Sequence, residues 1–231
     1  MALVQYGGGV LDARGSIGGQ VHSRNRFGNY IRARTTPVNP QSTRQNTIRA
    51  ITAALASYWS TTMSAANRAL WEVYADSIVR QNKLGATIKL TGFNHFVRSN
   101  AFILQNGGAQ VDAGPSTLTL PGADPTFVCV VDEATQKITV TFDNALPWAI
   151  AVGGHLGVYM SAPKAPGVSF IGGPFRLAGT INGAVVPPTT GEELDVPFPV
   201  AEGQNVVCRA RIVEGDGRLS DYFQHFSSCT A

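Results

Sequence analysis

The chain has 231 residues and a mass of 24.5 kDa, enough for one large domain or two modest ones. Its hydrophobic fraction of 44% is ordinary for a globular protein, but only 14% of its residues are charged, against roughly 25% in typical soluble domains. No apolar run approaches the ~18 residues of a membrane helix, and no export signal is evident at the N-terminus. We therefore expect synthesis in the cytoplasm and no membrane partner.

The formal charge of +3 is unevenly distributed along the chain. Residues 1–50 carry seven arginines against a single acid, Asp12, whereas residues 113–231 contain six basic and eleven acidic residues. The first 38 residues are also rich in glycine and lack a sustained apolar period, so alone they would not offset their ordering entropy. We expect an extended basic arm over residues 1–38. Its alternating pieces at 19–23 and 29–34 would pair with a sheet edge supplied by the body or by a neighbour.

Residues 39–110 are expected to form a small three-helix unit, because apolar residues recur there at helical spacing. The first helix has two candidate starts, Asn39 followed by proline and Ser42 in a capping box. The second starts at Thr62 or Ser64. We expect the core of this unit to contain Ile51, Leu55, Trp59, Leu70, Trp71, Tyr74 and Phe96.

Residues 111–125 are typical of a linker, and residues 126–231 are expected to form a β-sandwich domain. The segments with strand-like alternation are 127–131, 137–142, 155–160, 174–181, 205–213 and 219–226. Short strands with frequent turns and no intervening helix predict an antiparallel sandwich of immunoglobulin or fibronectin III type, and an α+β fold overall. The acids Glu192, Glu193 and Asp195 are assigned to a solvated loop.

Cysteine and histidine give no sign of a reactive or metal site. Cys129, Trp148 and Cys208 follow the immunoglobulin order, but we expect buried free thiols more than a disulfide, and whether the two cysteines pair stays open. The histidines, which we expect to be at the surface or hydrogen-bonded, are His22, His95, His155 and His225. No nucleophile motif, phosphate loop or metal-ligand spacing is present, so we predict no catalytic, cofactor or metal residues and no enzyme activity.

Residues 15–104 carry a series of elements in a fixed order. They begin with the string GSIGGQVHSRNRFGNYIRARTTPVNPQSTRQ, followed by Trp59, the segment 68–71, Tyr74, and then 90–93 through Phe96. This series resembles a group of tailed-bacteriophage proteins that combine such a helical region with a β-sandwich. Most members are uncharacterised or taken to be virion components. The resemblance implies location in a virion.

We therefore favour a non-enzymatic structural protein of a tailed-phage virion, such as a decoration, cement or minor capsid protein of the head. It would bind copies of itself or major capsid or tail proteins through the arm, by arginine–carboxylate pairing. The arm residues expected to make these contacts are Arg14, Arg24, Arg26, Tyr30, Arg32 and Arg34.

Two alternatives stay open. The first is a tail or baseplate part or a host-receptor-binding module, with residues 161–170 and 185–195 as binding loops at one end of the sandwich. The second is a packaging protein that binds DNA through the arginines of the arm.

Overall fold

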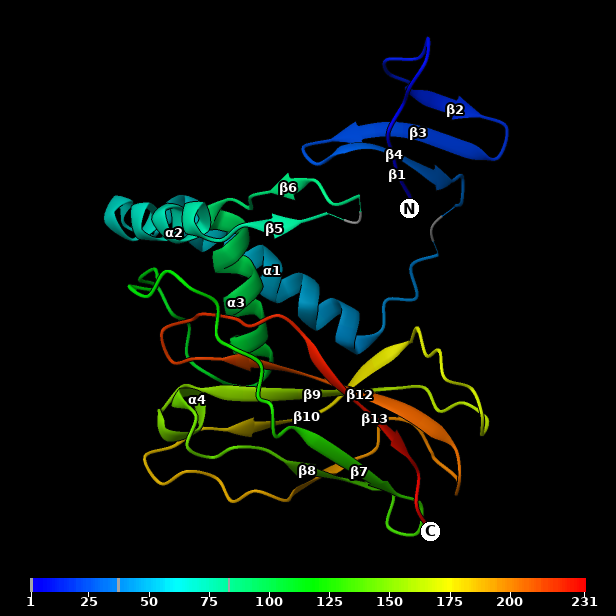
Figure 1. Ribbon diagram of the computed structural model, residues 1–231. Helices are drawn as coiled ribbons and strands as arrows, with labels where there is room; N and C mark the ends of the chain where they lie inside the picture. Colours follow the sequence, from blue (N-terminus) through cyan, green and yellow to red (C-terminus); the bar gives the residue numbers. More distant parts are fainter. Residues whose placement is uncertain (1, 37, 83) are drawn as a thin grey trace.

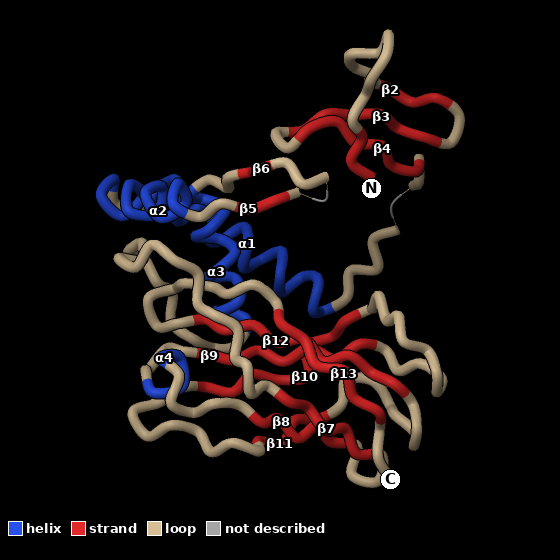
Figure 2. The backbone as a smooth tube through the Cα atoms, viewed as in Figure 1, coloured by secondary structure: helices blue, strands red, loops and turns tan. Residues whose placement is uncertain are grey.

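The computed structural model describes residues 2–36, 38–82 and 84–231, and its fold is α+β (Figure 1). Along the chain, a small antiparallel sheet is followed by a helical unit and then by a β-sandwich. Figure 2 shows the same order in space, with the helices between the N-terminal sheet and the sandwich. The two ends of the chain therefore lie at opposite ends of the molecule (Figure 1).

The N-terminal segment forms a sheet whose strand order is β1-β4-β3-β2. Its antiparallel strands are β1 (Ala2–Val4), β2 (Gly15–Ile17), β3 (Gln20–Asn25) and β4 (Gly28–Ala33). The arm is extended in conformation, but the expectation that its strands need an edge from the body or from a neighbour is wrong. A two-residue turn joins β3 to β4, and such local pairing costs little loop-closure entropy.

The helical unit contains three helices and a two-stranded hairpin. These are α1 (Thr43–Thr61), α2 (Ala65–Ser77), β5 (Arg80–Gln81), β6 (Thr87–Ile88) and α3 (Gly92–Gln105). Side-chain oxygens cap all three helices: Ser42 accepts from the backbone N–H of Gln45, and Ser64 from that of Asn67. Thr91 caps α3 in the same way. The start at Ser42 is thus confirmed, and Asn39 lies outside the helix.

Of the seven residues predicted for the helical core, four are buried, two are half-buried and one is exposed. Leu55, Trp71, Tyr74 and Phe96 are buried, while Ile51 and Trp59 are half-buried against them. Leu70 is 44% exposed, so its assignment to the core is wrong. The buried stripe of α2 contains Trp71, Tyr74 and Ala75, and Leu70 lies next to that stripe but outside it.

The sandwich consists of a three-stranded sheet, β11-β8-β7, and a four-stranded sheet, β10-β9-β12-β13. The strands are β7 (Val128–Asp132), β8 (Lys137–Thr141), β9 (His155–Ser161), β10 (Phe175–Asn182), β11 (Glu192–Asp195), β12 (Asn205–Val213) and β13 (Phe223–Ser228). The short helix α4 (Pro147–Ile150) joins β8 to β9. Seven antiparallel strands in a three-plus-four arrangement define an immunoglobulin- or fibronectin III-like sandwich.

The acidic segment near residue 193 is a strand and not the expected loop. Glu192 to Asp195 pair with β8 as an edge strand, and Asp195 accepts a hydrogen bond from Lys137 at 2.6 Å. Leu194 is half-buried against the core, and its charged neighbours Glu193 and Asp195 are exposed. Alternation of this kind over only four residues gives a weak sequence signal, which explains why the strand was missed.

The helical unit is joined to the sandwich by a small core of its own. Phe102 and Ile103 of α3 pack with Val213 and Leu219, which are buried beside them. Residues 111–125 run between the two parts as an ordered crossing, because the Asn100 side chain makes hydrogen bonds with both backbone groups of Val111. As a result β12 is buried on both faces, although its alternation predicts one wet face.

Candidate interaction sites: the N-terminal sheet and the arginine junction

The N-terminal sheet has no core. Among the described residues 2–36 no side chain is buried: Tyr30 and Ile31 are partly buried, and Leu11 is 92% exposed. Ile17 is 73% exposed. A single-layer sheet with both faces wet gains little from burial and is marginal alone. This sheet therefore presents two uncovered faces and two short edge strands.

The register assigns the side chains to the two faces. Residues directly opposite each other in an antiparallel pair share a face, so Tyr30, Arg32 and Leu3 lie on one side. Arg24 lies on the other side with Ile31. The structure therefore brings Tyr30 and Arg32 together, as proposed contact residues should be, but it separates them from Arg24.

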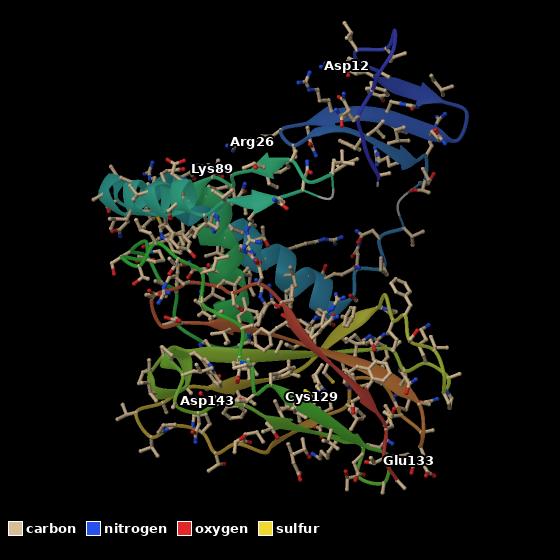
Figure 3. All side chains as sticks on the ribbon, viewed as in Figure 1. Asp12, Arg26, Lys89, Cys129, Glu133 and Asp143 are labelled. Carbon is tan, nitrogen blue, oxygen red and sulfur yellow. The ribbon has the colours of Figure 1, made fainter. Side chains whose placement is uncertain are left out.

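The sheet's arginines are exposed. Arg14 pairs with Asp12 at 3.1 Å, and both lie at the exposed end of the sheet. Within the part of the chain that the structure describes, the other four arginines of this sheet make no ion pair: Arg24, Arg26, Arg32 and Arg34. Arg26 occupies the turn between β3 and β4 (Figure 3). The surface thus carries positive charge that acids of this chain leave uncompensated.

A groove separates the N-terminal sheet from the β5–β6 hairpin. It is lined by Leu3, Asn25 and Phe27 on one side and by Gln81, Asn82 and Ile88 on the other. Figure 1 shows the sheet standing next to this hairpin and away from the sandwich. The rest of the protein therefore leaves most of the sheet's surface free.

A second polar cluster lies at the junction between the helical unit and the sandwich. The Nη1 of Arg80 donates to Oδ1 of Asp221 at 2.7 Å, and the Nη2 of Arg98 reaches the same oxygen at 3.4 Å. Arg211 donates from Nη1 to the hydroxyl oxygen of Tyr222 at 3.0 Å. Two guanidinium groups thus share one carboxylate oxygen, and a third, from Arg211, is bonded to the neighbouring tyrosine.

Burial perturbs the titratable groups of this junction. Burial, reinforced by the charges of Arg80 and Arg211, lowers the pKa of Arg98 to about 10. Burial, together with the charges of Arg98 and Arg80, also lowers the pKa of His95 to about 4. Burial alone would raise the pKa of Asp221, but the hydrogen bond and charge of Arg80 outweigh it and hold that pKa below its usual range. His95 is therefore neutral near pH 7, beside an excess of positive charge.

Sequence reasoning missed this junction. Alternation along β12 places Arg211 on a face expected to be wet, but α3 covers that face and leaves Arg211 only 8% exposed. Arg80 and Arg98 lie more than a hundred residues earlier in the chain. No local pattern connects positions that only the docking of α3 onto the sandwich brings together.

The other candidate residues have structural environments. His22 is hydrogen-bonded to Tyr6 at 3.0 Å, His155 to Asn182 at 2.8 Å, and His225 accepts from the backbone of residue 129 at 3.4 Å. His95 differs from the expectation, because it is 2% exposed and its Nε2 has no hydrogen-bond partner in the part of the chain described. The His95 ring packs against Tyr74 in the helical core, so His95 is not at the surface.

The three cysteines are free and buried in the sandwich core. Hydrogen bonding with the Cys208 thiol and burial raise the pKa of Cys129 above its usual range. Trp148 is buried in helix α4 and not on a strand, so it does not occupy the immunoglobulin position. The described residues contain no cluster of three metal-ligating side chains, and none of their helices is long and apolar enough to span a membrane.

The two loops expected to form one binding end lie at opposite ends of the sandwich. The loop after β9 and the loop after β10 alternate ends because these strands are antiparallel neighbours. Phe170 in the first loop is 86% exposed, and Val185 in the second is 80% exposed. These apolar side chains therefore cannot contribute to a single site, which corrects the expectation.

Comparisons with known proteins add little to the geometry. No protein-family model matches the chain, and no curated protein does. Among solved structures, an Fn3-like protein from Clostridium thermocellum is similar to 49% of this chain over 97% of its own length, with 18% sequence identity and a TM-score of 0.32.

Proposed function

We propose that this protein is a non-enzymatic structural component of a tailed-phage virion that binds neighbouring subunits through its N-terminal sheet. Within that class we propose an accessory head protein, of the decoration, cement or minor capsid type. The observation that carries the proposal is a four-stranded sheet in which none of the described side chains is buried. Such a sheet gains its stability when other surfaces cover it.

Charge supports a protein partner. The four arginines of the sheet that make no ion pair with the described residues would form bidentate hydrogen bonds with carboxylates of a neighbouring subunit. The same chain carries eleven acidic and six basic residues over 113–231, so a second copy offers a complementary surface. Tyr30 and Arg32 on one face supply the pair of residue types that are enriched where interfaces bind most tightly.

The resemblance of residues 15–104 to tailed-phage proteins supports the virion setting. Those residues include β2, β3 and β4 of the sheet, the helices α1 and α2, and all but the last residue of α3. The series of motifs that carries the resemblance therefore covers most of the surface proposed to make contacts. The same surface would serve a component of the tail or baseplate, and imaging of labelled particles decides between head and tail.

The decisive experiment removes the charge of the sheet without removing the sheet. A variant with Arg24, Arg26, Arg32 and Arg34 changed to Gln is expected to enter particles about tenfold less than the wild type, which corresponds to about 1.4 kcal/mol of contact free energy. The matched control removes four exposed charges elsewhere: Arg49, Lys89, Lys164 and Arg176 to Gln. Incorporation is measured by the stoichiometry of the protein in purified particles.

Two outcomes would overturn the proposal. Equal incorporation of the sheet variant, the control variant and a chain lacking residues 1–38 would remove the role of the sheet. A salt-sensitive gel shift of DNA by the wild type, lost in the sheet variant, would favour the packaging alternative. The separation of Arg24 and Arg32 onto opposite faces argues against a single DNA-binding face.

A further inference from the structure

The arginine junction carries more positive charge than its own acid balances. Arg80, Arg98 and Arg211 are mostly buried, with the side chains of Arg80 and Arg98 only 20% and 25% exposed. Asp221, the carboxylate bonded to Arg80 and Arg98, has a side chain that is 62% exposed. Guanidinium groups withdrawn from water need anionic or hydrogen-bonding partners to offset their lost hydration. One exposed carboxylate is a poor match for two of them, and the third, Arg211, donates to the uncharged Tyr222 hydroxyl.

Several guanidinium N–H groups of the junction have no hydrogen-bond acceptor among the described residues. Buried guanidinium nitrogen atoms without a partner in the described part of the chain are Nε and Nη2 of Arg80, Nη1 of Arg98, and Nε and Nη2 of Arg211. Arg211 is held in place from two sides, since its Cζ lies 4.6 Å from the centre of the Tyr222 ring and 5.5 Å from that of Phe102. Phe102 is one helical turn from Arg98 on α3, so Arg98 and the ring that Arg211 contacts lie on the same face of that helix.

We propose that Arg80, Arg98 and Arg211 form a binding site for an oxyanion, a phosphate or a carboxylate, at the junction of the helical unit and the sandwich. Arginine presents its donors in a planar fork that matches two oxygens at once, and the unpartnered nitrogens belong to all three side chains. A second anion would take those donors, while Asp221 keeps its hydrogen bonds with Arg80 and Arg98. This site is separate from the N-terminal sheet and does not depend on the proposed function.

An anion at this site would hold the helical unit against the sandwich. It joins β5, α3 and the β12–β13 segment, which belong to the two halves of the molecule. An anion bound there would neutralise the repulsion between the guanidinium groups and hold the halves together. A carboxylate from a neighbouring protein and a free inorganic phosphate would meet the same donors, and the experiment below separates these sources.

The test uses the full chain in thermal denaturation and titration calorimetry. Sodium phosphate and sodium acetate are compared with sodium chloride at equal ionic strength, so that general screening cancels. We expect phosphate to raise the melting temperature and to bind with a Kd of about 1 mM or tighter. Binding of acetate as well as phosphate would identify a carboxylate as a fitting ligand, and binding of phosphate alone would identify the free anion.

Variants at the junction keep the proposal falsifiable. Arg80→Gln changes a partly exposed member of the three and is expected to weaken phosphate binding at least tenfold, whereas the control Arg176→Gln on the sandwich surface leaves it unchanged. Asp221→Asn removes a negative charge that repels a second anion and is expected to tighten binding. The absence of any anion effect beyond that of chloride in the wild type, or an equal effect in Arg80→Gln, would overturn the site.

Discussion

The N-terminal sheet and the sandwich are both built from antiparallel strands, yet they differ completely in what they bury. In the sandwich, Val131 and Ile138 of one sheet and Leu156 of the other have no exposed surface. In the N-terminal sheet, Val21 and Ile31 stand at comparable strand positions and are half-exposed. Hydrogen bonding between strands organises both regions, but only a second layer removes apolar surface from water.

The difference separates two uses of a β-sheet within one chain. The sandwich closes its core with its own strands, so its stability belongs to the monomer. The N-terminal sheet leaves its faces and edges uncovered, so its stability depends on what covers it. Matched substitutions in the two regions test this contrast directly.

The largest expected effect comes from the same substitution made in both regions. Ile138→Ala removes a side chain with no exposed surface and should lower the free energy of unfolding by about 2–5 kcal/mol. Ile31→Ala in the N-terminal sheet should cost less than about 1 kcal/mol, because its side chain is only partly buried and packs in no second layer. Chemical denaturation of the isolated protein measures both. Equal losses would mean that the sheet shares a cooperative core with the rest of the molecule.

A smaller effect is expected from pH, at the helical unit between the two regions. His95 lies against Tyr74, with Arg80 and Arg98 nearby, and its pKa is lowered to about 4, first by burial and then by the charges of the two arginines. The unfolded chain, with a histidine pKa near 6.5, therefore binds more protons between these values. Stability should fall as the pH drops from about 6.5 to about 4, by at most about 3 kcal/mol.

The variant His95→Gln isolates that contribution, because glutamine carries no charge at any pH. The slope of stability against pH between about 6.5 and 4 should flatten in the variant. An unaltered slope in His95→Gln would show that other groups produce the acid sensitivity.

Local sequence patterns predicted the helices and strands well, whereas environments that depend on long-range packing were predicted less well. The caps at Ser42 and Ser64 and the alternation along β8 and β12 are local signals, and each predicts an element that the structure contains. Leu70 was misplaced because its position relative to the buried stripe depends on which side of α2 meets α3. A local pattern predicts the type of a secondary-structure element better than it predicts which of its side chains will be buried.

The candidate sites divide in the same way. The basic charge of residues 1–38 is readable from composition, but the pairing of β3 with β4, which places Arg24 and Arg32 on opposite faces, is not. The junction arginines come from three distant segments of the chain. Their side chains come together only because α3 packs over β12. An arginine at an alternating strand position gives the same sequence pattern whether its side chain is buried or exposed. The sequence alone therefore does not identify Arg211 as buried.

The smallest of the three expected effects comes from the contact between α3 and the sandwich. This contact covers the four-stranded sheet of the sandwich, whereas the N-terminal sheet has no comparable cover among the described residues. Gly157 of β9 lies under Phe102, and a Cβ at this position would overlap the ring. Gly157→Ala should therefore lower the free energy of unfolding by about 1–3 kcal/mol, because the Phe102 ring must shift within a packed contact. Denaturation monitored by circular dichroism measures the loss.

The control for this contact is Gly122→Ala in the crossing segment, where a Cβ meets no atom within 4 Å. That change should be neutral or slightly stabilising, because alanine has fewer unfolded conformations to lose. If Gly157→Ala were as neutral as Gly122→Ala, α3 would not be seated on β9, and Arg98 and Arg211 would have no reason to meet. The packing that buries the outer face of the four-stranded sheet is thus also what assembles the arginine junction, and no such cover exists for the sheet formed by residues 2–34.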